Sequence, residues 1–92
     1  MIRSFRCRDT EAFFNDVNVP RFRAFERIAR RKLLYMHQAR KLEDLRVPPG
    51  NRLEALKASL RGQHSIRINE RYRICFVWKG SDIFDVEIVD YH

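Results

Sequence analysis

The sequence predicts an α+β fold, in which a strand and two helices precede an antiparallel sheet and the helices pack on one face of that sheet. The length of 92 residues fits one domain with one core, over 1–92. Two observations predict the class. The run VPPGN (47–51) cannot continue a helix and separates a helical apolar period from a strand period. The connections between the later strands are also short enough for hairpins.

The first half of the chain predicts one strand and two helices. Residues 2–6 alternate apolar and polar, which is typical of a strand. Asp9 is expected to cap a short helix over TEAFFND (10–16). Pro20 suits the first turn of a helix, so we expect a long amphipathic helix over about 20–44. Its apolar stripe consists of Phe22, Phe25, Ile28, Ala29, Leu33, Met36 and Ala39.

The second half predicts the sheet. A short run, RLEAL (52–56), precedes three strand-like runs, HSIRIN (64–69), YRICFVW (72–78) and IFDVEIV (83–89). Residues 69–71 and 79–82 join these runs by connections of hairpin length, so the three strands should be antiparallel neighbours. YRICFVW is apolar on both faces, which is typical of a central strand.

The charge of the chain is concentrated in the long helix. The whole chain carries +7, and eight of its basic residues fall between Arg21 and Lys41, against the single acid Glu26. Lys32 lies near the apolar stripe and must extend its side chain past it. The arc opposite the stripe carries Arg23, Arg27, Arg30, Arg31 and Lys41. This face fits a polyanion such as nucleic acid, an acidic protein partner, or simple solvation.

Several classes of protein and site are excluded by the sequence. The longest apolar runs are too short to span a bilayer, and the N-terminal segment lacks the apolar region of a secretory signal, so we expect a cytoplasmic protein without membrane contact. Cys7 and Cys75 lack the spacing of a zinc or redox site and should be reduced. His37, His64 and His92 have no metal-ligand spacing, and no glycine-rich phosphate loop occurs, so neither a metal nor a cofactor is expected. His37 should lie solvated on the outer face of the long helix.

Two arginines and the last three residues could carry chemistry. If Ile66 and Ile68 face the helices, Arg67 points to the other face of the sheet, where Arg73 can join it. These arginines either pair with Glu54 or Glu87 or form a cluster for a phosphate. RNA cleavage needs a base, an acid and cations around the scissile phosphate. The C-terminal Asp90, Tyr91 and His92 include groups for either proton role and a ring that can stack on a base.

The pieces "SIRIN", "YRICF" and the terminal "DYH", within a run that begins "RLEALK", resemble HigB-type plasmid maintenance killer toxins of the RelE/ParE superfamily. The resemblance covers essentially the whole chain, from "MIRSF" onward. It implies a RelE-like βαα fold followed by an antiparallel sheet, and a toxin that enters the ribosomal A site and cuts mRNA. It also implies a helix-turn-helix antitoxin of the HigA kind, through which any contact with DNA would be indirect.

The same resemblance implies roles for individual residues. The catalytic terminal triplet of the family falls on Asp90, Tyr91 and His92, and its phosphate-handling basic residues fall on Lys57 and Arg73, with Arg67 as an addition. Binding to RNA or the ribosome would fall on Arg67 and on the basic helix residues Arg23, Arg27, Arg30 and Arg31. Where some relatives have L-H-x-L-K, this chain has Glu54 in place of the histidine. A glutamate ionised at neutral pH can act as a base and not as an acid, which leaves the division of proton roles open.

Two other functions are consistent with the sequence. Relatives of the ParE kind keep the fold, lack the RNA-cutting residues and poison gyrase; the presence of Asp90, Tyr91, His92 and Arg73 argues against that activity. A non-catalytic nucleic-acid-binding module would use the basic helix alone and would tolerate the loss of His92.

Overall fold

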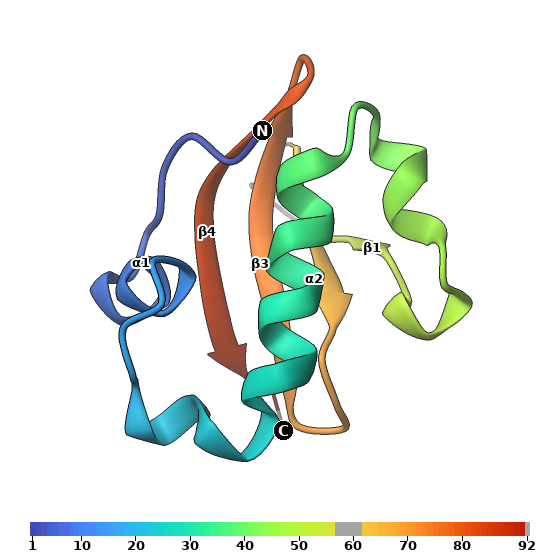
Figure 1. Ribbon diagram of the computed structural model, residues 1–92. Coiled ribbons are helices and arrows are strands. Elements are labelled where there is room, and N and C mark those ends of the chain that lie inside the picture. Colours follow the sequence, from blue (N-terminus) through green and yellow to red (C-terminus); the bar gives the residue numbers. More distant parts are fainter. Residues whose placement is uncertain (57–61, 92) are drawn as a thin grey trace.

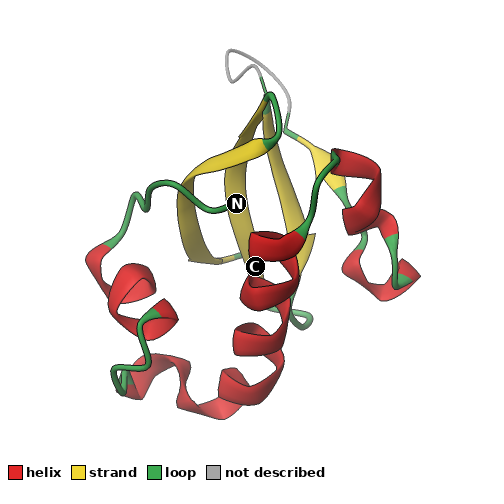
Figure 2. Cartoon of the chain, turned by 45° about the horizontal axis from the view of Figure 1, so that its top comes forward, coloured by secondary structure: helices red, strands yellow, loops and turns green. Residues whose placement is uncertain are grey.

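A computed structural model describes residues 1–56 and 62–91 of the chain. The first half contains α1 (Arg8–Phe14), the 3-10 helix η1 (Pro20–Phe25), α2 (Glu26–Gln38) and the 3-10 helices η2 (Leu42–Arg46) and η3 (Pro49–Asn51). The second half contains β1 (Glu54–Ala55), β2 (Gln63–Arg67), β3 (Tyr72–Lys79) and β4 (Asp82–Asp90). Helix α2 lies over one face of the sheet and α1 lies beside β4 (Figure 1), and Figure 2 shows the same division between helices and strands.

The four strands form one antiparallel sheet in the order β1-β2-β3-β4, which confirms the predicted α+β class. The predicted first strand is present only as two isolated parallel bridges, in which Ile2 and Phe5 pair with Ile83 and Val86 of β4. Asp85 has a left-handed φ of 55°, and its N–H is bound by the Ser4 side chain. The backbone of β4 is therefore irregular between the two bridges, which prevents a continuous ladder with the N-terminal segment.

The prediction of one helix over 20–44 was wrong, because the segment contains a 3-10 turn, α2 and a second 3-10 turn. Ala39 leaves the helical region with a ψ of 138°. The Asp44 carboxylate then accepts the backbone N–H groups of Arg40 and Lys41 at 3.0 and 3.2 Å, and these bonds stabilise the start of η2. A local cap thus competes with continuation of the helix, and apolar periodicity does not reveal this.

The predicted cap of the first helix also differs. Cys7 occupies the N-cap position of α1, and Asp9 lies in the first turn. The Asp9 carboxylate instead accepts a hydrogen bond of 2.9 Å from Arg21, which follows α1 in the chain. An acid in the first turn of a helix is still favourable because the helix dipole is positive there.

The core lies between the helices and one face of the sheet. Ile66, Ile74 and Ile88 are cross-strand partners on β2, β3 and β4, and all three are buried. From the opposite side, Leu33 and Met36 of α2 are buried against this layer. Full burial of such a side chain stabilises the fold by about 1.5–3 kcal/mol. This row fixes which side chains of the central strands face away from the helices.

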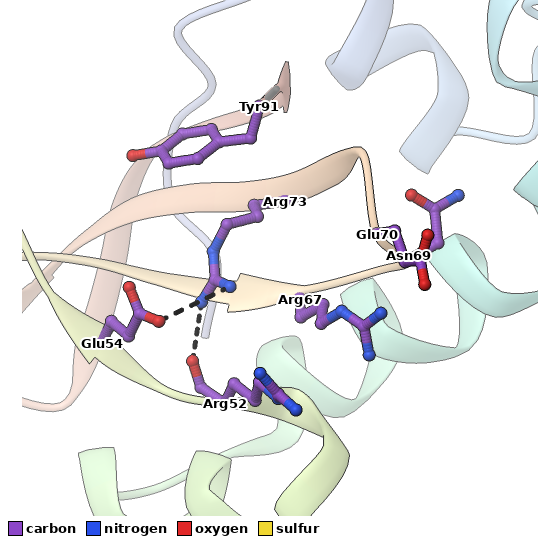
Figure 3. Close-up of a pocket in the computed structure, with 7 residues that line it drawn as sticks. All are labelled: Arg52, Glu54, Arg67, Asn69, Glu70, Arg73 and Tyr91. Atoms are coloured by element: carbon purple, nitrogen blue, oxygen red, sulfur yellow. Dashed lines mark hydrogen bonds and ion pairs between the residues drawn. The ribbon is translucent and has the colours of Figure 1, made fainter.

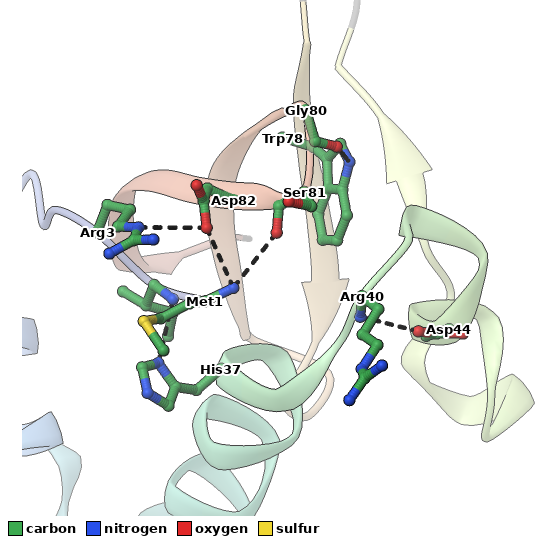
Figure 4. Close-up of polar contacts among 10 residues, drawn as sticks. Met1, Arg3, His37, Arg40, Asp44, Trp78, Gly80, Ser81 and Asp82 are labelled. Carbon is green, nitrogen blue, oxygen red and sulfur yellow. Dashed lines mark hydrogen bonds and ion pairs between the residues drawn. The ribbon is translucent and has the colours of Figure 1, made fainter.

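His37 contacts the N-terminal segment, so the prediction that it is solvated was wrong. Its Nδ1 atom accepts the backbone N–H of Ile2 at 3.1 Å, and its ring packs edge-on against Phe14 with centroids 5.4 Å apart. Met1 lies nearby, with its ammonium group 3.6 Å from Asp82 (Figure 4). The N-terminal segment therefore covers part of the α2 surface that a helical projection alone places in solvent.

Candidate active site

A hollow of about 420 Å³ opens on the sheet face that points away from the buried isoleucines. Two acidic side chains and three guanidinium groups line it, together with an amide and a phenol (Figure 3). The lining residues are Arg52, Glu54, Arg67, Asn69, Glu70, Arg73 and Tyr91. They come from the segment around β1, the β2–β3 hairpin and the end of β4, so segments far apart in the sequence form one site.

Strand register brings Arg67 and Arg73 together. The two residues are direct cross-strand partners, next to the buried pair Ile66 and Ile74 on the opposite face. The predicted convergence of Arg67 and Arg73 on one face is thereby confirmed. Like charges directly opposite each other destabilise an antiparallel pair. An arrangement that costs stability in this way is expected where an anion is bound.

Arg73 is held rigidly. It is buried, with Nε 2.8 Å from the Ser65 hydroxyl and Nη2 2.6 Å from the Arg52 carbonyl oxygen. Nη2 also donates to the Ser65 carbonyl oxygen at 3.3 Å. Its Nη1 lies 3.8 Å from Glu54 Oε1, an ion-pair contact too long for a direct hydrogen bond. Of the alternative that both arginines pair with Glu54 or Glu87, only the Arg73–Glu54 contact is found among the described residues, and it lies in the hollow.

The structure separates the predicted terminal residues. Tyr91 lines the hollow opposite Arg73, and its side chain is exposed. Asp90 does not line it, because its carboxylate binds Arg71 through three contacts of 2.9–3.1 Å. Lys57 and His92 lie outside the described residues, so their predicted roles stay predictions from the sequence.

Sequence reasoning missed Arg52, Asn69 and Glu70 as lining residues. Arg52 follows the proline-rich turn and adopts a left-handed φ of 45°, which no local pattern announced. Asn69 was assigned to the end of a strand-like run and to a hairpin connection, and not to a site. Its Oδ1 accepts the N–H groups of Arg71 and Tyr72 at 2.9 and 2.8 Å, a turn contact typical of asparagine that could have drawn attention to this loop.

Comparison with known proteins identifies the family. A family model described as "RelE-like toxin of type II toxin-antitoxin system HigB" matches residues 3–92. The chain belongs to this HigB toxin family. It is 39% identical over 80 residues to Toxin HigB-1 of Vibrio cholerae, covering 85% of this chain and 84% of that protein. An uncharacterized protein of Haemophilus influenzae is 32% identical over 57 residues, covering 62% of this chain and 56% of that protein.

Membership in the HigB family implies that the chain is the toxin of a type II toxin–antitoxin pair, and that an antitoxin is its partner. Within residues 1–56 and 62–91, no helix combines the length and apolar character needed to cross a membrane.

In this HigB-family toxin, Lys32 of α2 adds positive charge behind the hollow. Its ammonium group donates to the backbone carbonyl of Arg67, which joins α2 to the end of β2. Burial lowers the pKa of Lys32, and the charges of Arg31, Arg67 and Arg73 lower it further. Burial and the neighbouring positive charges therefore both disfavour the charged form of Lys32.

The basic helix presents three of its four predicted arginines to solvent. Arg23, Arg27 and Arg31 are exposed. Arg30 is held against α1, with Nη1 2.6 Å from the Phe13 carbonyl oxygen and 3.0 Å from Asp16, and its guanidinium covers the Phe13 ring at 4.2 Å. The prediction that Arg30 points outward with the others was wrong, because α1 packs beside it.

Proposed function

We propose that the chain is an endoribonuclease that cuts mRNA in the A site of the ribosome and so inhibits translation. In this proposal, a helix-turn-helix antitoxin of the HigA kind holds the toxin inactive and makes any contact with DNA, and the toxin acts in the cytoplasm. The observation that carries the proposal is the hollow, which three guanidinium groups line together with carboxylates and an aromatic ring. Guanidinium groups match the oxygens of a phosphate, and an exposed ring can stack on an unpaired base.

The proposed reaction is attack of a ribose 2′-oxygen on the adjacent phosphorus. Glu54 accepts the 2′-hydroxyl proton, because it is an exposed carboxylate in the hollow. The new P–O bond forms as the bond to the 5′-oxygen breaks, leaving a 2′,3′-cyclic phosphate. Arg67 and Arg73 stabilise the negative charge that builds on the phosphate oxygens. The departing 5′-oxygen takes a proton, which we assign to His92 from the sequence alone, as we assign Lys57 to the phosphate.

Dependence on the ribosome follows from the openness of the site. The side chain of Glu54 is 58% exposed and Tyr91 is 42% exposed, so these groups form no closed cavity around a phosphate. A flexible RNA strand must therefore be bent into the in-line geometry by another surface. Correct placement of reacting groups can lower a barrier by several kcal/mol, roughly 7–11 in the best intramolecular cases. The path of mRNA through the A site would supply this placement.

Binding to ribosomal RNA is assigned to Arg23, Arg27 and Arg31, with Arg67 contacting RNA at the hollow. Reversal of the three helix residues to Glu should weaken ribosome binding and lower the slope of log affinity against log salt by about 0.7–0.9 per lost phosphate contact. Single-turnover cleavage at saturating ribosomes should survive. Arg30 should be left unchanged in this variant, because its contacts with Phe13 and Asp16 stabilise the fold.

The test of the proposed function compares naked mRNA with mRNA on programmed ribosomes. We expect little cutting of naked RNA and defined breaks at A-site codons when ribosomes are added. Glu54→Gln should reduce the rate by about 10²–10⁴-fold. Glu43→Gln changes an exposed glutamate on η2 and serves as the matched control.

Three results would contradict the proposal. Rapid, codon-independent degradation of naked RNA would remove the need for the ribosome. Loss of DNA supercoiling activity of gyrase, with mRNA intact, would indicate a ParE-like poison. Ribosome binding without cleavage, unaffected by Glu54→Gln, would indicate a non-catalytic binding module.

A further inference from the structure

Arg71 joins the β2–β3 hairpin to the end of β4 through its side chain and its backbone. Its guanidinium binds both oxygens of Asp90, with Nε 2.9 Å from Oδ1 and Nη2 2.9 Å from Oδ2. Its carbonyl oxygen accepts the N–H of Tyr91 at 2.5 Å. Two-point contact of arginine with a carboxylate fixes direction as well as distance. The three bonds together hold consecutive residues of the chain end.

The hairpin itself is fixed on the Arg71 side. Asn69 accepts the backbone N–H groups of both Arg71 and Tyr72, which sets the turn. The Arg71 guanidinium lies 5.7 Å from the centroid of the Tyr72 ring, and that ring packs 4.5 Å from Phe25. The Arg71–Asp90 pair itself is exposed, with 59% of the Arg71 side chain and 35% of the Asp90 side chain accessible to solvent. The Tyr72 ring beside the guanidinium is the part of this contact that packs on the core.

Strand alternation connects this contact to the hollow. Asp90 pairs with Tyr72 across the sheet, and Tyr72 faces the helices because it packs on Phe25. The next residue, Tyr91, must then face the opposite side, where Arg73 and the hollow lie. Because the Asp90 carboxylate is held on the helix side of the sheet, the Tyr91 ring lies on the side of the hollow.

We propose that Arg71 is a positioning residue that holds Tyr91 over the phosphate-binding hollow, and that Asp90 is its anchor and takes no proton in the reaction. This inference rests on the proposed function for its consequence in catalysis, and on the contacts of Arg71 for its structural part. The pKa of the Arg71 guanidinium is raised by its hydrogen bonds to Asp90 and by the charge of that carboxylate, which agrees with a well-formed pair. The guanidinium contacts both oxygens of the Asp90 carboxylate, and this two-point contact fixes the orientation of the carboxylate.

A double-mutant cycle tests the role in catalysis. Arg71→Gln, Asp90→Asn and the double variant should each lower kcat on programmed ribosomes by the same factor, about 10- to 100-fold, because all three lose one contact that positions Tyr91. KM and the salt dependence of binding should stay within about twofold of the unmodified protein. Arg46→Gln, an exposed arginine on η2, is the control for loss of one positive charge.

Two kinetic outcomes would overturn the proposal. If Asp90 moves a proton, Asp90→Asn will be more damaging than Arg71→Gln, and the two losses will multiply in the double variant. If Arg71 instead contacts an RNA phosphate, Arg71→Gln will raise KM and lower the salt slope by about 0.7–0.9.

Amide hydrogen exchange gives a readout that does not require cleavage. The N–H of Tyr91 should exchange at least about tenfold faster in Arg71→Gln, because its hydrogen bond to the carbonyl oxygen of residue 71 opens more often when the side-chain contact with Asp90 is lost. The N–H of Ile74 in the central strand should be unaffected. Unchanged exchange at Tyr91 would refute the positioning role. If the unmodified protein fails to cut RNA under any condition, the proposed function fails, and the exchange measurement alone decides whether Arg71 holds Tyr91.

Discussion

Replacement of Arg73 by Met should weaken the fold as well as the reaction. The guanidinium of Arg73 is buried and donates three hydrogen bonds, to the Ser65 hydroxyl, the Ser65 carbonyl and the Arg52 carbonyl. Hydrogen bonds from a charged donor contribute about 1.5–3 kcal/mol each, but these three share one side chain and Ser65 can rotate to a new partner. We therefore expect a loss of about 3 kcal/mol in the free energy of unfolding.

Arg67→Met provides the matched comparison on the same face of the sheet. Arg67 lies directly opposite Arg73, and its guanidinium makes no hydrogen bond or ion pair with other residues in the part of the chain that the structure describes. Removal of one of two facing like charges should change the unfolding free energy by less than about 0.5 kcal/mol. Both variants should lose an arginine that stabilises the charge on the RNA phosphate during cleavage. Only the free energy of unfolding should therefore distinguish them.

Urea titration of the two variants measures this difference directly. For a domain of this size, about 3 kcal/mol corresponds to a fall in Tm of roughly 12–24 °C. Cleavage by Arg73→Met should then be measured at low temperature, where most of the protein is folded. An unfolding free energy of Arg73→Met within about 0.5 kcal/mol of the unmodified protein would refute the reasoning. Equal losses in the two variants would refute it too.

Three further predictions concern the fold. Gly62→Ala should lower the free energy of unfolding by about 1–2 kcal/mol, because the φ of Gly62 is +76° and a new Cβ would lie 3.2 Å from a β3 carbonyl oxygen. Gly50→Ala should raise it by about 0.4–1 kcal/mol, because a Cβ there would meet no atom within 4 Å. Urea unfolding compares the two variants. The hydrogen bond from the backbone N–H of Arg40 is the main reason that the pKa of Asp44 lies below its usual range. The ionised Asp44 therefore stabilises the fold fully above a pH of about 4, and this stabilisation is lost as the pH falls through the pKa of Asp44 in the folded protein. Asp44→Asn should thus lower Tm at pH 7 and leave it nearly unchanged near the acid limit. Arg30→Met should cost about 1–2 kcal/mol, with the loss of its bonds to the end of α1.

Much of the architecture could be predicted because it depends on near neighbours in the chain. Alternation along β2 predicted that Ile66 faces the helices and Arg67 the other face, where Arg73 could join it, and burial and register agree with this placement. Hairpin-length connections fixed the antiparallel order. Most of the apolar stripe of the long segment is buried, although Ile28 is 37% exposed.

The helix ends and the partners of charged groups could not be predicted in the same way. The apolar periodicity continues through Ala39. The Asp44 carboxylate, however, accepts the backbone N–H groups of Arg40 and Lys41, and α2 ends before them. His37 and Arg30 project outward on a helical wheel, yet the N-terminal segment and α1 cover them. These contacts depend on how separate elements pack, and a pattern within one element contains no information on its neighbours.

The residues alone were enough to predict the fold class and the residue types that could bind a phosphate. They also predicted that Arg67 and Arg73 can share one face of the sheet if Ile66 faces the helices, because side chains alternate along a strand. Tertiary structure decided what each of those groups does. In the folded protein, Arg73 is buried against Ser65, whereas Arg67 lines the hollow. Asp90 binds Arg71, and Tyr91 lines the hollow. The physical reason is that hydrogen bonding and burial act between residues brought together by folding, and Arg71 and Asp90 meet only because β3 and β4 pair along their length.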